Sequence, residues 1–94
     1  MQVVSITNLQ ALPQVSGIYK VIGIDNKVLY VGQAKNIYQR WHKGHHKISE
    51  ILSVCGIDAY IEWVEIPEWL LNRAENSAIS FYKPPLNRKN VSIV

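Results

Sequence analysis

The chain has 94 residues, of which 48% are hydrophobic and 18% are charged, and its net charge is +3. A chain of this length and composition is expected to fold as one domain. It has no apolar run near the roughly 20 residues of a membrane span, and its start lacks the features of a signal peptide. The single cysteine, Cys55, excludes an internal disulfide framework and is typical of a reducing compartment. We therefore expect one cytoplasmic domain over residues 1–94, with its core over about 16–87.

Positive charge is concentrated in the middle of the chain. Lysine, arginine and all three histidines cluster there, as Lys35, Arg40, His42, Lys43, His45, His46 and Lys47. Such a cluster favours contact with phosphate groups, although a solvated helix face would have the same composition. The histidines have no metal-ligand spacing with cysteine, which argues against a structural zinc site.

The first elements predicted are two strands of a hairpin. Residues 1–15 form either an entry loop or an edge strand that covers the sheet. Two runs of β-branched and aromatic residues follow, and they predict strands over Ser16–Gly23 and Val28–Gly32. Asp25 and Asn26 lie between the runs and favour a tight turn, because both tolerate left-handed backbone conformations.

The hairpin brings two phenols together. Side chains alternate between the faces of a strand, so Tyr19 and Tyr30 are expected side by side on one face. Gly17 lies two residues before Tyr19 and Gly32 two residues after Tyr30, and each would let another backbone or a ligand approach closely.

Two short helical segments are expected next. Asn36 is a plausible N-cap for a helix over Ile37–Lys43, in which Ile37 and Trp41 share the core side. Gly44 ends or bends that helix. A second segment covers His46–Val54, with an apolar stripe made of Ile48, Ile51 and Leu52.

The last elements are a strand and a longer helix. Residues Asp58–Ile66 alternate in polarity and predict a third strand. Pro67 suits the first turn of a helix that runs to Tyr82. The apolar positions of this helix are Leu70, Leu71, Ala74, Ala78 and Phe81. The tail from Arg88 to Val94 is expected to be loosely held.

This order of elements, β-β-α-α-β-α, predicts an α+β fold. The expected architecture is a three-stranded antiparallel sheet flanked by helices.

Glu75 is the acidic candidate for chemistry. Leu71 lies four residues before it and Ile79 four residues after it, so its carboxylate lies on or beside an apolar stripe. A buried carboxylate needs a partner, and Mg²⁺ can be held by one or two carboxylates together with a substrate phosphate. A partly exposed glutamate at the rim of the stripe is the alternative.

Two further polar residues have open alternatives. Arg40 has the guanidinium geometry that binds phosphate oxygens, but it is equally a solvated surface arginine. Asn87 follows two prolines and is either a simple turn residue or an amide that ties the tail to the sheet.

Five elements of the sequence, taken in chain order, resemble the GIY-YIG nuclease domain over about Ser16 to Asn87, which is most of the chain. They are Gly17-Ile18-Tyr19, then Tyr30-Val31-Gly32-Gln33-Ala34-Lys35-Asn36, Arg40-Trp41, Glu75, and Pro84-Pro85-Leu86-Asn87. One triplet alone is a weak signal, whereas five elements in this order are specific.

The resemblance implies metal-dependent hydrolysis of DNA phosphodiester bonds. By resemblance, Glu75 holds one Mg²⁺ or Mn²⁺, Tyr19 is the general base or orients the attacking water, and Tyr30 positions water or phosphate. Arg40 offsets charge that develops on the phosphate, and Lys35 and Lys43 join it in contacting DNA. The supporting residues are Gly17, Gly32 and Asn87.

This sequence departs from the family at one position. The family often has a tyrosine or histidine one helical turn after the arginine, where this chain has Gly44. His45 follows one residue later, and we expect it to reach the site if Gly44 bends the helix. The expected partners are DNA and a protein that supplies specificity, since the domain itself should have little sequence preference.

Two other functions are compatible with the same fold. One is a nucleic-acid-binding module without catalysis, and the other is a protein-interaction unit.

Overall fold

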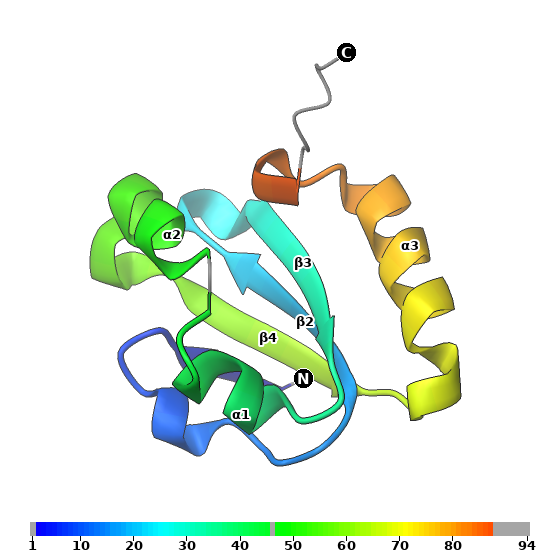
Figure 1. Ribbon diagram of the computed structural model, residues 1–94. Helices are drawn as coiled ribbons and strands as arrows, with labels where there is room; N and C mark the ends of the chain where they lie inside the picture. Colours follow the sequence, from blue (N-terminus) through cyan, green and yellow to red (C-terminus); the bar gives the residue numbers. More distant parts are fainter. Residues whose placement is uncertain (1, 46, 88–94) are drawn as a thin grey trace.

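The computed structural model describes residues 2–45 and 47–87 of the chain. An antiparallel sheet lies at its centre, with the strand order β1-β4-β2-β3 (Figure 1). The strands are β1 (Gln2–Ser5), β2 (Gly17–Ile22), β3 (Val28–Ala34) and β4 (Tyr60–Glu65). The helices are α1 (Ile37–His42), α2 (Ile48–Cys55) and α3 (Leu71–Tyr82). The predicted loose tail, residues 88–94, lies outside the described residues.

The α+β class is confirmed, but the predicted count of three strands is wrong. The sheet has four strands, because β1 pairs with β4 from Gln2 opposite Trp63 to Ser5 opposite Tyr60. The run that forms β1 is short and partly exposed, so its sequence carries too little alternation to separate an edge strand from a loop.

The hairpin of β2 and β3 follows the prediction closely. Asp25 and Asn26 have positive φ angles of 65° and 59°, as a tight turn requires. β3 continues two residues beyond its predicted end at Gly32, to Ala34, because Gly17 pairs with Ala34 across the hairpin. This β3 is an edge strand of the sheet, and its outer edge lies between α1 and α3 (Figure 1).

The helices cover both faces of the sheet, so the molecule has three layers. On one face, Tyr19 and Val21 of β2 pack with Ile37 and Trp41 of α1 and Ile51 of α2. On the other face, Ile18 and Val31 pack with Leu71, and α3 closes that side. No helix in these described parts is both long and apolar enough to cross a membrane.

Some helix predictions are confirmed and others are shifted. Asn36 caps α1 by accepting a hydrogen bond from the Gln39 amide at 2.9 Å, and Gly44, with φ 86°, follows the end of the helix. In α2, the predicted apolar stripe is wrong at Leu52, which is 42% exposed, whereas Cys55 is buried in the core.

The last helix begins later than predicted. Residues Glu68–Leu70 form a 3-10 turn after Pro67, and α3 starts at Leu71. The predicted core position at Phe81 is wrong, because Phe81 is 79% exposed and Ile79 packs on the core instead.

Candidate active site

The side chain of Tyr19, which belongs to β2, extends over the edge strand β3. It is opposite Gly32 in the β2–β3 pair, and a Cβ atom at position 32 would come within 2.5 Å of the Tyr19 ring carbon Cζ and of its hydroxyl. Glycine at this position therefore lets the phenol reach over β3 toward the outer edge of the sheet. Gly17 allows a close approach of β4 instead, because a Cβ at position 17 would collide with the Val64 carbonyl.

The Tyr19 hydroxyl meets His45. The distance from Tyr19 Oη to His45 Nε2 is 2.6 Å, and the two side chains are 1% and 2% exposed. The turn after α1, which contains Gly44, carries His45 back over the sheet. The expectation that His45 reaches the phenols is therefore met by the geometry.

Aromatic rings hold this pair in place. Trp41 stacks on the His45 ring at a centroid distance of 4.1 Å and meets Tyr19 edge-on at 5.3 Å. Tyr30 is 6.4 Å from Tyr19 and 5.5 Å from His45, between ring centroids. The two phenols thus lie on one face, as the alternation of the strands predicts.

The electrostatics of the phenols connect them to Arg40 and Glu75. Burial raises the pKa of Tyr19 above its ordinary value, and a hydrogen bond with the Arg40 guanidinium opposes that shift. Burial also raises the pKa of Tyr30, against the charge of Arg40. The Glu75 carboxylate adds to both shifts, so the arginine of α1 and the acid of α3 both lie within electrostatic range of the phenols.

Glu75 is held from the edge strand by an amide. Nε2 of Gln33 donates to Glu75 Oε1 at 2.7 Å and to Asn72 Oδ1 at 2.7 Å. One amide nitrogen of β3 therefore fixes two side chains of α3. Glu75 is half-buried, so it has a protein partner and still faces the outside.

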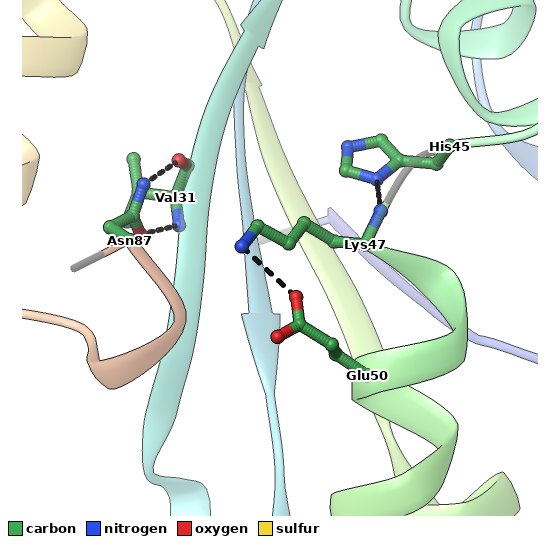
Figure 2. Close-up of polar contacts among 5 residues, drawn as sticks. All are labelled: Val31, His45, Lys47, Glu50 and Asn87. Carbon is green, nitrogen blue, oxygen red and sulfur yellow. Dashed lines mark hydrogen bonds and ion pairs between the residues drawn. The ribbon is translucent and has the colours of Figure 1, made fainter. Parts of the chain in front are cut away.

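Asn87 pairs with the outer edge of the same strand. Its Oδ1 accepts from the Val31 amide at 2.7 Å, and its Nδ2 donates to the Val31 carbonyl at 2.8 Å (Figure 2). The side-chain amide thus imitates a neighbouring strand for one residue. Of the two alternatives from the sequence, the structure has the tie between the tail and the sheet.

The predicted DNA contacts line one hollow beside the phenols. It has a volume of about 300 Å³ and lies along the start and end of α1. Its lining residues are Ala34, Lys35, Asn36, Gln39, Arg40, Lys43 and Gly44. Lys35, Arg40 and Lys43 are exposed, so three cations surround one concave surface next to Tyr19.

A larger groove lies away from these residues. It has a volume of about 660 Å³ and runs between β4 and α3. Lys20 Nζ is 2.7 Å from Glu62 Oε1 and 3.2 Å from the Tyr82 hydroxyl there. Burial would lower the Lys20 pKa, but these two partners raise it above its ordinary value. The charges of Lys20 and Glu62 are thus paired with each other, and none of the predicted site residues lines this groove.

Two residues of the resembling elements have no role at the site in the sequence analysis. Gln33 orients Glu75, and Trp41 was expected only as a core residue. The position of Gln33 directly after Tyr30-Val31-Gly32 carried a signal, because side chains alternate along the strand. Gln33 must therefore face α3, opposite to Tyr30.

The donor set is suited to a hard cation. The described part of the chain has no group of three or more histidine, cysteine, aspartate or glutamate side chains that could hold a metal. Mg²⁺ needs fewer protein ligands, because it keeps several waters and binds one or two carboxylates together with phosphate oxygens. The single, oriented Glu75 carboxylate fits Mg²⁺ or Mn²⁺ and does not fit a structural zinc.

The chain matches the model of a known protein family. Residues 15–90 match the family model of the GIY-YIG catalytic domain.

Among curated proteins, the chain is similar to UvrABC system protein C of bacteria. It is 36% identical to the protein from Wolbachia pipientis wMel over 86 residues, and 30% identical to that from Psychrobacter cryohalolentis over 86 residues. Each match covers 84% of this chain but only 14% of the relative's length. The chain therefore corresponds to one part of these relatives.

Among solved structures, it is similar in fold to the GIY-YIG N-terminal endonuclease domain of UvrC from Thermotoga maritima. A point mutant of that domain bound to its catalytic divalent cation has a TM-score of 0.71 and 19% identity, and the match covers 88% of this chain and 93% of the other. The magnesium-bound form has a TM-score of 0.68 and 19% identity, with 84% and 90% covered.

Proposed function

Since this chain belongs to the GIY-YIG family, we propose that it is a divalent-metal-dependent endonuclease that hydrolyses phosphodiester bonds in DNA. One observation carries the proposal: a phenol that bonds to His45 lies within range of Arg40 and of an oriented carboxylate, Glu75. Its solved structural neighbours are described as bound to a catalytic divalent cation, magnesium in one case.

Each side chain has a proposed role in this reaction. Tyr19 takes a proton from the attacking water, and Tyr30 positions that water or the phosphate. Arg40 offsets the negative charge that develops on the phosphate. Glu75 holds Mg²⁺ or Mn²⁺, and Gln33 keeps its carboxylate in one orientation. When bound, the cation supplies polarisation of the phosphate and stabilisation of the leaving oxygen.

The cationic hollow gives DNA a place to bind. Lys35, Arg40 and Lys43 surround it, and contacts from such side chains to phosphates carry no sequence information. We propose that the chain forms one catalytic domain with little sequence preference, which acts in the cytoplasm, and that a protein partner supplies specificity. The curated relatives belong to the UvrABC system, so DNA repair is the proposed setting.

The experiment is a plasmid-nicking assay with and without Mg²⁺. We expect nicking that needs the cation and is lost in Arg40→Ala and in Glu75→Ala, while both variants stay folded by circular dichroism. Arg73→Ala and Glu68→Ala are matched controls, because both side chains are exposed and neither belongs to the site. Nicking that survives the site substitutions would reject the proposal. Salt-sensitive DNA binding with no nicking would instead favour a non-catalytic binding module.

A further inference from the structure

His45 is enclosed by the residues that surround Tyr19. It is 2% exposed, its ring stacks on Trp41 with 15° between the planes, and Tyr30 meets it edge-on. Its backbone carbonyl also accepts from the Ile48 amide at 3.1 Å. The ring is therefore fixed at the start of α2, and its two nitrogens point to defined partners.

Those two partners determine which nitrogen carries the proton. Nε2 is 2.6 Å from the Tyr19 hydroxyl, and the Lys47 backbone amide lies 3.1 Å from Nδ1 (Figure 2). A backbone amide only donates, so Nδ1 must accept and has no proton of its own. A neutral imidazole with an unprotonated Nδ1 carries its proton on Nε2.

We infer that the Lys47 amide fixes His45 as the Nε2–H tautomer, so that His45 donates a hydrogen bond to Tyr19 and does not accept one from it. His45 is then a positioning residue that acts through Tyr19. The Tyr19 proton must then leave to an acceptor other than His45, and the Tyr19 oxygen keeps a donor as it becomes negative. The catalytic meaning of this arrangement rests on the proposed function, whereas the tautomer itself does not.

A second histidine provides the opposite case in the same molecule. Nδ1 of His42 is 2.9 Å from the carbonyl oxygen of Tyr38. A carbonyl only accepts, so His42 must carry a proton on Nδ1. The two histidines are therefore expected to differ in their spectra, and His42 serves as an internal reference.

The direct test is a long-range proton–nitrogen NMR correlation spectrum of the ¹⁵N-labelled full chain near pH 7. Resonances are assigned with His42→Gln and His46→Gln. We expect a protonated Nε2 and an unprotonated Nδ1 for His45, and a protonated Nδ1 for His42. A proton on Nδ1 of His45, or on both of its nitrogens, would overturn the inference. The spectrum needs no nuclease activity. An inactive protein with this tautomer would therefore reject the proposed function and leave the tautomer standing.

Substitutions test the role of the donor. His45→Leu removes it, and we expect kcat for nicking to fall about a hundredfold with KM little changed, as for other single donors to a developing oxyanion. His45→Gln can place an N–H where Nε2 lies and should restore activity to within about tenfold of the wild type. His42→Leu is the matched control. A His45→Leu variant as active as the wild type, or a His45→Gln variant as impaired as His45→Leu, would overturn the positioning role.

Discussion

The surroundings of Tyr19 act on its oxygen in two opposing ways. Burial raises the pKa of the phenol, which keeps it protonated at neutral pH. The hydrogen bond from Arg40 and the contact with His45 lie at the same oxygen, and the Arg40 bond lowers that pKa. A general base in this position works only through the small fraction of molecules that have lost the proton.

That fraction makes the reaction pH-dependent. Burial places the Tyr19 pKa well above neutral pH, and in that range the phenolate fraction increases tenfold for each unit by which the pH rises. The nicking rate should therefore rise by about tenfold per pH unit between about pH 6 and pH 8. Tyr19→Phe should lower the rate by about a hundredfold or more and remove this slope. Initial rates at saturating Mg²⁺ provide the measurement. A wild-type rate that falls with pH over this range would contradict the role of Tyr19 as base.

Gly32 is the second residue with a sharp prediction. In Gly32→Ala, the new methyl group would lie 2.5 Å from the Tyr19 ring, so the phenol would have to move. Overpacking of this kind should cost about 1–3 kcal/mol in the free energy of unfolding by urea, together with most of the activity.

The cost of Gly32→Ala should depend on the phenol. When the same substitution is made in a Tyr19→Ala background, the collision is absent and the further loss should be small. An equal loss in both backgrounds would show that the cost arises from the backbone at position 32 and not from Tyr19.

At the scale of elements, β3 lies between the part of the site that contains Tyr19 and the part that contains Glu75. Its Gln33 side chain orients Glu75 of α3, and Gly32 lets Tyr19 of β2 reach over it. The pair of hydrogen bonds from Asn87 occupies the outer edge of this strand at Val31. A tail side chain therefore fixes the strand on which both parts depend.

Loss of that contact should weaken the strand. Asn87→Ala leaves the amide and carbonyl of Val31, which is buried, without this partner, and should lower the free energy of unfolding by about 1–3 kcal/mol. Asn87→Asp keeps an acceptor for the Val31 amide but places a carboxylate oxygen against the Val31 carbonyl in place of the Nδ2 donor, so it should lose at least as much. Urea unfolding of the three proteins gives the comparison. No difference between Asn87→Ala and the wild type would mean that the contact adds nothing to stability.

Much of the fold could be predicted from local patterns in the sequence. The hairpin has a turn at Asp25 and Asn26, the cap of α1 is Asn36, and Tyr19 and Tyr30 share a face, all as predicted. These features depend on residues close in sequence or on the alternation of a strand. Arg40 and Glu75, which belong to the resembling elements, also come within electrostatic range of both phenols.

Other features depend on tertiary contacts that no local pattern contains. β1 becomes a strand only through β4, and Phe81 is exposed because of the rotation of α3 against the sheet. The bond from Gln33 to Glu75 joins residues that are 42 positions apart. The approach of His45 to Tyr19 depended on the bend at Gly44, which the sequence suggested only as a condition.

At the scale of the whole molecule, exposed positive charge lies on one side of α1, where we propose that DNA binds. Lys35 and Lys43 are exposed at the hollow beside Arg40. The double substitution of Lys35→Gln and Lys43→Gln should weaken binding of duplex DNA at low salt. It should also reduce the slope of log K against log salt by about 2, which is near 0.9 for each lost phosphate contact.

The control for this prediction is Lys27→Gln. Lys27 is also exposed but lies at the hairpin turn and not at the hollow, so its loss should leave the slope nearly unchanged. Fluorescence anisotropy with a short duplex at several salt concentrations gives both slopes. If Lys27→Gln, which removes one charge, reduces the slope half as much as the double variant, which removes two, DNA is attracted by net charge alone.

The central claim is that Arg40 of α1 and Glu75 of α3 act on one phosphate from opposite sides of β3. Residues that act as one unit have strongly non-additive effects on rate. The decisive measurement is the Mg²⁺-dependent nicking rate of Arg40→Ala, Glu75→Ala and the double variant. The double variant should be about as slow as the slower single variant. If its loss instead equals the product of the two single losses, or if either single variant keeps the wild-type rate, the two residues do not form one site.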